Sequence, residues 1–164
     1  MNIKNSEMKE ICIQKLKDRG VELQDITDIV FDLQKKYVSN LTMAICSEAV
    51  DRVLTKREVH YAILTGVELD VLAEKKMLSE PLQSLIDSDN PLYGIDEILV
   101  LSICNVYGSI GLTNFGYVDK LKPGIIGKLD AFGKTTNHCH TFLDDIIGAI
   151  AAAAASSVAH NSAE

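Results

Sequence analysis

The chain has 164 residues, of which 47% are hydrophobic and 24% are charged, with a net charge of −7 and a pI of about 5.1. This composition is typical of a single folded domain and excludes a disordered chain. The acidic balance argues against nucleic-acid binding, and the chain has no polybasic run that would hold it on an anionic membrane.

Cysteine usage and the N-terminus predict a cytoplasmic protein. The first seven residues lack the apolar core of a signal peptide. The longest apolar run, Ile146 to Ala155, is shorter than the roughly 20 residues of a membrane span. We therefore expect no transmembrane segment and at most peripheral membrane contact. The four cysteines form no CxxC pair and are expected to be reduced thiols: Cys12, Cys46, Cys104 and Cys139.

Residues 1–90 hold 28 of the 39 charged side chains and have the pattern of amphipathic helices. Thr55 and Glu58 have the spacing of a capping box, and the segment from Asp87 to Pro91 is a loop. Apolar residues at helical spacing predict helices over 6–18, 24–38, 41–54 and 56–77, and a short one that starts at Ser79 and ends near Asp87.

From Gly94 onward the chain is more apolar and carries few charges. Thr141 and Asp144 have capping-box spacing, and the apolar residues after Asp145 cover every face, so a buried helix is expected here. The preceding segment 95–107 is also apolar nearly all round. We predict helices over 95–107 and 109–121, a polar loop over 127–140, and a last helix from Thr141.

These elements predict an all-α protein, a multi-helix bundle with a buried central helix surrounded by others and no β-sheet. We expect a single helical domain over residues 1–164. Its amphipathic outer helices would lie in 1–90, and its apolar core helices, which carry the acidic site, in 91–160. Apolar helices in so short a chain leave a face to cover, so a homo-oligomer is also expected.

Two acidic pairs, Asp96-Glu97 and Asp144-Asp145, each open an apolar helix. Acidic residues are common in a first helical turn because they offset the helix dipole, so each pair alone has a structural explanation. If the two helices start at the same end of the bundle, their carboxylates converge in a partly buried place and need a counter-charge. Ligation by oxygen alone indicates Mg²⁺ or Mn²⁺ and not zinc.

Asp119 and Lys122 lie three positions apart on a predicted helix and therefore face the same way. Lys122 is a candidate ligand for phosphate, because its ammonium group is a compact positive charge. The alternative is a surface ion pair, which contributes little to stability.

Two other motifs do not meet the requirements of known sites. Gly133-Lys134-Thr135 lacks the first glycine of a phosphate loop, because position 128 is Lys, and no strand precedes it. His138-Cys139-His140 has the residue types of a zinc site. It has no second ligand pair at suitable spacing, so a polar loop is the favoured interpretation.

Three segments together resemble the phosphatidylglycerophosphatase A family. They are Ile95-Asp96-Glu97, the stretch from Phe115 to Pro123 with its Asp-x-x-Lys-Pro ending, and Leu143 to Ala149, which begins Leu-Asp-Asp-Ile-Ile. The resemblance implies a Mg²⁺-dependent phosphatase that removes the terminal phosphate of phosphatidylglycerophosphate. It also implies metal-binding and catalytic roles for five acids: Asp96, Glu97, Asp119, Asp144 and Asp145.

By the same resemblance, Asp119 and Asp145 are the catalytic candidates, either of which could act as base or nucleophile, and Lys122 binds phosphate. The family's signature arginine is replaced here by Gly116, so Lys134 is the candidate for a substitute cation. The N-terminal half has neither the transmembrane helices nor the Gly-rich motif of membrane-bound members. The chain is therefore more similar to the soluble branch of low-temperature-requirement C proteins.

The sequence thus predicts a phosphatase that acts on phosphatidylglycerophosphate or a related glycerol phosphate in phospholipid metabolism. The alternative is a non-catalytic helical protein that oligomerises and retains a structural or regulatory metal site. A further possibility is activity on a soluble phosphate ester, which the missing membrane anchor suggests.

Overall fold

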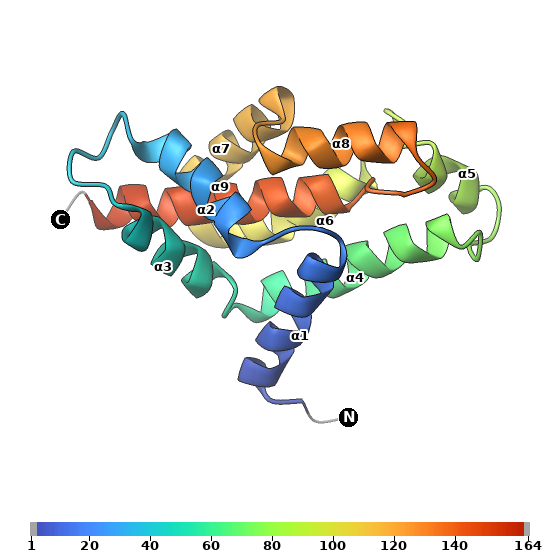
Figure 1. The fold of residues 1–164 in the computed structure, drawn as a ribbon, viewed down its shortest axis with the longest axis horizontal. Coiled ribbons are helices and arrows are strands. Elements are labelled where there is room, and N and C mark those ends of the chain that lie inside the picture. The colour runs from blue at the N-terminus through green and yellow to red at the C-terminus, as the bar shows by residue number, and fades with distance from the viewer. Residues whose placement is uncertain (1–2, 163–164) are drawn as a thin grey trace.

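The computed structural model describes residues 3–162, and their secondary structure is entirely helical (Figure 1). No β-strand occurs between residues 3 and 162, so the predicted all-α class is confirmed. In chain order the elements are α1 (Asn5–Asp18), α2 (Leu23–Gln34), α3 (Met43–Val53), α4 (Arg57–Glu74), α5 (Leu82–Asp87), α6 (Ile95–Cys104), the 3₁₀ turn η1 (Asn105–Tyr107), α7 (Gly108–Leu121), α8 (Ile125–Thr135) and α9 (Leu143–Asn161).

The last helix, α9, is the centre of the bundle. It runs through the middle of the molecule in Figure 1 and packs against α2, α3, α4, α6, α7 and α8. Every residue from Leu143 to Ser156 is buried, as expected for a helix that is apolar on all faces. The alanines from Ala151 to Ala155 have no exposed surface, and their small side chains let the surrounding helices approach closely. The predicted central helix is therefore confirmed.

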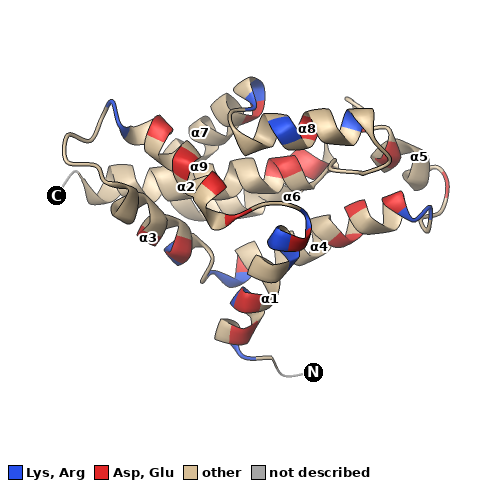
Figure 2. Ribbon diagram, viewed as in Figure 1, with Lys and Arg blue, Asp and Glu red and all other residues tan. Residues whose placement is uncertain are grey.

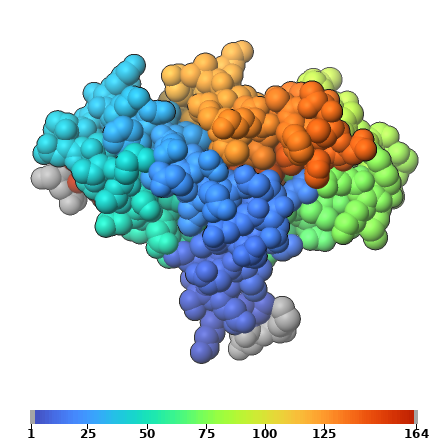
Figure 3. All heavy atoms as spheres, viewed as in Figure 1, coloured from blue at the N-terminus to red at the C-terminus, as the bar shows by residue number. Residues whose placement is uncertain are grey.

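The helices of the N-terminal half form an outer layer. In α2, Ile26 and Val30 face the core whereas Asp28 is exposed, which is the pattern of an amphipathic helix. Figure 2 shows charged residues spread along α1 to α4 and nearly absent from the second half of α9. At one edge α1 projects from the broad body of the molecule (Figure 3), and it packs on α4 through a face that includes the buried Cys12 and Leu16.

The polar loop predicted over 127–140 is wrong in its first part, which belongs to α8. The glycines of this segment are typical of a loop, but Gly127 lies in a helix and allows the Lys122 carbonyl to approach its backbone closely. A Cβ atom there would lie 2.5 Å from the Lys122 carbonyl oxygen. Ile126 and Leu129 are buried, and α8 packs on α9. Burial of this face therefore outweighs the low helix propensity of glycine.

Neither predicted capping box forms. The Thr55 hydroxyl donates to the Arg52 carbonyl oxygen at 2.7 Å, and the Thr141 hydroxyl donates to the Ile86 carbonyl oxygen at 2.6 Å. The N-cap residue of α9 is Phe142, whose side chain makes no capping hydrogen bond. In both cases the hydroxyl group satisfies a carbonyl of an earlier helix, so it does not reach the amides that follow it.

The segment 95–107, predicted above to be apolar nearly all round and to belong to the core helices, is not buried on all sides. Both α6 and α7 pack on α9 by one side and leave the other uncovered. No charged residue lies between Ile98 and Val118. We call this uncovered surface the α6–α7 face. Its large apolar side chains are each at least 37% exposed: Ile95, Ile98, Leu101, Val106, Ile110, Leu112, Tyr117 and Leu121.

By length and hydropathy alone, two helical segments could cross a membrane, Ile95–Leu121 and Leu143–Asn161. The second is the core helix α9, which is largely buried, so its hydropathy has an ordinary explanation. The first segment contains the α6–α7 face, and only 28% of its most apolar window is buried. Small polar residues interrupt the segment Ile95–Leu121, so it contains no long unbroken apolar run in the sequence.

Gly66 marks a close crossing of α4 and α9. A Cβ atom at this position would lie 2.6 Å from Ile146 Cδ1 and 3.0 Å from Phe142 Cβ, and both of these side chains are fully buried. We expect Gly66→Ala to lower the free energy of unfolding by about 1–3 kcal/mol, because the packed core must shift to admit the methyl group.

Gly116→Ala on α7 is the matched control for this prediction. Apart from its chain neighbours and the backbone of its own helix, no described residue comes within 4 Å of a Cβ added at Gly116. The alanine should therefore raise stability by about 0.5–1 kcal/mol through its higher helix propensity. Thermal unfolding followed by circular dichroism measures both changes. If the two variants shifted Tm in the same direction, the close crossing at Gly66 would be contradicted.

Candidate functional site

All seven predicted site residues line one open cleft with a volume of about 690 Å³. They come from the starts of α6 and α9, the end of α7 and the last turns of α8, so the acidic ends of the two apolar helices do lie together. Three further charged residues, Asp89, Lys120 and Asp130, also line the cleft, which gives it seven carboxylates and three ammonium groups. The predicted residues are Asp96, Glu97, Asp119, Lys122, Lys134, Asp144 and Asp145.

Lys122 is held over the acids by the end of α7. It is the C-cap residue, with a left-handed φ of 47° and ψ of 55°, and the proline that follows cannot continue the helix. Its Nζ donates to Asp119 Oδ1 at 2.9 Å and to Asp144 Oδ2 at 2.7 Å, and lies 3.8 Å from Asp145 Oδ1. The predicted pair of Asp119 and Lys122 thus forms, and it is joined to α9 instead of standing alone on the surface.

The charge of Lys122 is stabilised by these neighbours. Burial alone would lower the pKa of Lys122, but the carboxylates around it, Asp144 above all, raise that pKa well above its usual value. The ammonium group therefore stays charged throughout the physiological range, and it offsets part of the negative charge of the cleft.

Asp144 and Asp145 open α9 inside the bundle, where they are 5% and 4% exposed. Burial raises the pKa of Asp144 to about 6, against the opposing effect of Lys122. Burial, and then the charge of Asp144, raise the pKa of Asp145 to about 9. Both carboxyl groups therefore ionise less readily than a free aspartate, and a bound divalent cation would favour their ionised forms.

Asp96 provides a test of whether the cleft fits a cation. Its Oδ1 atom is buried and has no hydrogen-bond partner within the described part of the chain. Burial also raises the pKa of Asp96. An unpaired carboxylate oxygen is costly to bury, and a hard cation such as Mg²⁺ is a suitable partner for it. Glu97, the next residue, is exposed to solvent, so the donor set includes both buried and accessible oxygens.

Lys134 faces the cleft from the end of α8. Its Nζ lies 2.6 Å from Asp130 Oδ1 and 4.0 Å from Asp89 Oδ2, and its side chain is 59% exposed, so it remains accessible to an anion. Gly116, at the position of the family's arginine, is not among the described residues that line the cleft. Lys134 is therefore better placed than position 116 to supply the second cation.

Asp70 is a buried residue that the sequence analysis missed. Its carboxylate on α4 accepts hydrogen bonds from the backbone amides of Phe142 at 3.0 Å and Leu143 at 2.9 Å, so a side chain from another helix caps α9. Burial raises the pKa of Asp70 to about 8, although these amides oppose the shift. The one local signal was its spacing: Ile63, Val67 and Asp70 share the buried face of α4.

The family follows from a comparison with known proteins. A family model described as phosphatidylglycerophosphatase A matches residues 25–160, which include every residue of the cleft and leave out α1. The chain belongs to this family. The resemblance that three short motifs indicated is therefore confirmed over most of the chain.

The family's relatives share both sequence and fold with this chain. A Bacillus subtilis protein named "Uncharacterized protein YutG" is 59% identical over 155 residues, which cover 94% of this chain and 92% of YutG. The crystal structure of the low temperature requirement C protein from Listeria monocytogenes is 54% identical, with a TM-score of 0.93 over 98% of this chain and all of that one. The YpjQ structure from Bacillus subtilis is 57% identical, with a TM-score of 0.91 over 96% of each chain. The predicted similarity to low-temperature-requirement C proteins is confirmed.

Proposed function

We propose that this protein is a Mg²⁺-dependent phosphatase that removes the terminal phosphate of phosphatidylglycerophosphate or a related glycerol phosphate. The observation that carries the proposal is the unpartnered Oδ1 atom of Asp96 in a cleft that Lys122 and four more predicted carboxylates also line. Family membership supports the phosphatase class. A cleft with this excess of negative charge would repel a phosphate group unless a cation were bound between them.

The proposed metal site uses carboxylate oxygens alone, which suits Mg²⁺ or Mn²⁺. When bound, the metal supplies Lewis-acid polarisation of a phosphoryl oxygen. Mg²⁺ commonly takes only one or two carboxylates and keeps waters, so the cleft offers more ligands than one ion needs. The proposed ligands are Asp96, Glu97, Asp119, Asp144 and Asp145.

The remaining steps belong to the chain's own side chains. An ammonium group has three N–H donors, and Lys122 directs two of them to Asp119 and Asp144, which leaves one for a phosphate oxygen. Lys134 is the second proposed phosphate ligand. Either Asp119 or Asp145 would act as base toward water or as nucleophile toward phosphorus. As base, the carboxylate would take a proton from the water that attacks phosphorus, the ester P–O bond would break, and a proton would pass to the departing glycerol oxygen. As nucleophile, it would form an aspartyl phosphate as the ester P–O bond breaks, with a proton from solvent going to the glycerol oxygen, and water would then hydrolyse the aspartyl phosphate to release phosphate.

The α6–α7 face supports a lipid as the substrate. Asp96 lies in the first turn of α6 and Asp119 in the last turn of α7, and both line the acidic cleft. The apolar surface of these two helices therefore adjoins the cleft. We propose that this face contacts the bilayer surface on the cytoplasmic side while the phosphate enters the cleft. The four cysteines are all free and buried, which suits a reducing compartment. A second copy of the chain covering this face is the alternative.

Phosphate release from two substrates tests this proposal. The full chain is incubated with phosphatidylglycerophosphate in vesicles and, separately, with glycerol 3-phosphate, each with Mg²⁺ or with EDTA. We expect Mg²⁺-dependent release that is faster from the vesicles, together with co-sedimentation of the protein with them. Release that persists in EDTA would contradict the metal dependence, and faster release from glycerol 3-phosphate would indicate a soluble ester as the substrate.

The second candidate function is that of a non-catalytic protein that retains the metal site and associates with itself. Gly116 favours it, because the family's signature arginine is absent from that position. Such a protein would be stabilised by Mg²⁺ in thermal melting but would release no phosphate from either substrate. Light scattering on the same preparation would show whether it forms a homo-oligomer.

A further inference from the structure

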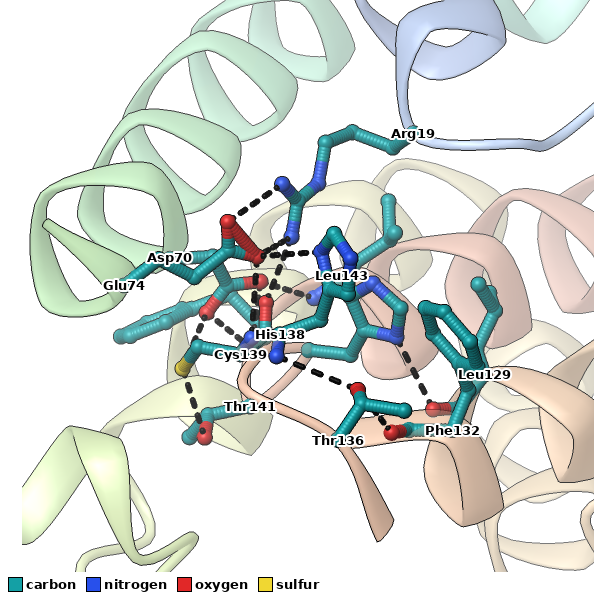
Figure 4. Close-up of polar contacts among 12 residues, drawn as sticks. Arg19, Asp70, Glu74, Leu129, Phe132, Thr136, His138, Cys139, Thr141 and Leu143 are labelled. Carbon is teal, nitrogen blue, oxygen red and sulfur yellow. Dashed lines mark hydrogen bonds and ion pairs between the residues drawn. The ribbon is translucent and has the colours of Figure 1, made fainter. Parts of the chain in front are cut away.

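Two histidines and a glutamate from distant parts of the chain come together outside the carboxylate cleft. Glu74 ends α4, and His138 and His140 lie in the segment between α8 and α9. One nitrogen of each imidazole and one carboxylate oxygen of Glu74 all lie within 4.8 Å of one another. Figure 4 shows Arg19, Glu74 and His138 pointing toward one another. The His-Cys-His fragment therefore gains the third ligand that the sequence did not show.

His140 is held in the orientation that a ligand histidine needs. Its Nδ1 lies 2.9 Å from the Leu129 carbonyl oxygen, and because a carbonyl can only accept, Nδ1 carries the hydrogen and Nε2 has a free lone pair. Histidines that bind metals commonly donate their second N–H to a backbone carbonyl in this way. The ring is 7% exposed and stacks on Phe132 with a centroid separation of 5.8 Å.

His138 is placed beside it by the same aromatic ring. It stacks on Phe132 with a centroid separation of 4.8 Å, and its Nδ1 lies 3.2 Å from Glu74 Oε1. The side chain is 49% exposed, so it can rotate by a small amount. Tetrahedral zinc bonds of about 2.0–2.1 Å place ligand atoms roughly 3.4 Å apart, so modest closure of this group gives bonding distances.

Glu74 is oriented by groups that do not use up its capacity to accept. Arg19 Nη1 donates to Oε2 at 3.0 Å, Arg19 Nη2 donates to Oε1 at 2.5 Å, and the Cys139 amide donates to Oε1 at 3.0 Å. A carboxylate has about four acceptor positions, and these two residues use three of them. The fourth contact is that of His138 Nδ1 with Oε1, which a bound cation would replace. Arg19 also offsets the charge of Glu74, which reduces the net attraction for a cation but locks the ligand in place.

Space for further ligands adjoins the group. A cavity of about 60 Å³ is lined by His138, Cys139 and His140, and a water molecule occupies about 30 Å³. The cavity shares Asp130 and Lys134 with the carboxylate cleft, so the two sites are neighbours. An ion pair between Arg19 and Glu74 alone would require neither two imidazoles stacked on the Phe132 ring nor the free Nε2 lone pair of His140.

We propose that Glu74, His138 and His140 bind a transition-metal dication of the zinc class, with water in the remaining positions. Two imidazole nitrogens and one carboxylate oxygen form a donor set that zinc uses and that Mg²⁺ does not. The bound ion ties the end of α4 to the segment that leads into α9, beside the carboxylate cleft and separate from it. The proposal does not depend on the phosphatase activity.

Cobalt binding tests the site directly. The full-length protein is stripped with a chelator and titrated with Co²⁺ in excess Mg²⁺, so that the carboxylate cleft is already occupied. We expect one Co²⁺ per chain with visible d–d absorption that Zn²⁺ displaces. His138→Gln should weaken binding by at least about tenfold, since even outer-shell changes at metal sites cost that much. His160→Gln, an exposed histidine at the end of α9, is the matched control and should bind as the wild type does.

Three results would overturn the proposal. They are the absence of a visible cobalt band in the wild type, equal affinity in wild type and His138→Gln, and a strong near-ultraviolet thiolate band, which would assign the ion to a cysteine. Because His138 is half exposed, His138→Gln should fold normally, and far-ultraviolet circular dichroism checks this.

Discussion

Replacing Asp145 with asparagine is expected to remove Mg²⁺-dependent phosphate release and, without metal, to stabilise the fold. Asp145 is 4% exposed, and both its burial and the charge of Asp144 raise its pKa to about 9. Asparagine has nearly the same shape but no charge to bury. We expect a loss of activity of about 100-fold or more, since even an outer-shell partner of a metal site contributes 10–100-fold.

The stability change of Asp145→Asn has a definite pH dependence. The ordinary pKa of an aspartate in an unfolded chain is about 3.9, so the folded protein holds a proton on Asp145 that the unfolded chain releases. The contribution of Asp145 to stability therefore falls as the pH rises from about 4 to about 9. Asparagine removes this loss, so the variant should gain about 1–3 kcal/mol over the wild type near pH 8.

Thermal melting at several pH values, with and without Mg²⁺, measures both effects of Asp145→Asn. In the wild type Mg²⁺ should raise Tm, and in the variant this rise should be small. Asp51→Asn is the control: its side chain is 58% exposed and is not among the described residues that line the cleft, so the variant should change neither activity nor the Mg²⁺ response. Activity that survives Asp145→Asn would exclude this carboxylate from the mechanism.

Replacing Asp70 with alanine is expected to be the most destabilising single change considered for this protein. The carboxylate of Asp70 satisfies the first amides of α9, those of Phe142 and Leu143, in a fully buried place. Each buried N–H group left without a partner costs about 1–3 kcal/mol, so we expect a loss of about 2–5 kcal/mol. For a chain of this size that corresponds to a fall in Tm of roughly 10 °C.

The variant Asp70→Asn separates hydrogen bonding from charge. Burial raises the pKa of Asp70 to about 8, so much of it is protonated at neutral pH. An asparagine side-chain oxygen can still accept a hydrogen bond from one of the two backbone amides. We therefore expect Asp70→Asn to lower the free energy of unfolding by less than half as much as Asp70→Ala does. Glu68→Ala, on the exposed side of the same helix, should change stability by no more than about 0.5 kcal/mol. If Asp70→Ala cost under 1 kcal/mol, water would be replacing the cap.

Local sequence patterns predicted most of the helices because they depend on spacing along one segment. The all-round apolar character from Leu143 to Ala155 marks a buried helix in any fold, and α9 is buried. The same pattern over 95–107 misled, because whether a helical face is covered depends on how many neighbours surround it. The sequence did not predict α8 because glycine has two effects: it weakens a helix, and it also permits close packing. Gly127 permits close packing, with the Lys122 carbonyl.

The carboxylate cleft could be predicted because Asp96, Glu97, Asp144 and Asp145 stand at helix starts and, with Asp119, match family motifs in order. Lys122 was predicted as a phosphate ligand, and the structure adds its contact with Asp144, which lies 22 residues away. The cap from Asp70, 72 residues before Phe142, and the approach of Glu74 to His138, 64 residues away, have no counterpart in local spacing. Such contacts arise when helices pack, so only a three-dimensional arrangement can show them.

The sequence by itself determined the helical class, the buried last helix and seven of the ten charged residues that meet in the cleft, because hydrophobic periodicity and acid placement act over a few turns. The tertiary structure alone decided which face stays uncovered on α6 and α7, which side chain caps α9, and which residues surround the two histidines. These outcomes depend on the relative positions of whole helices. Those positions follow from the packing of the entire core around α9.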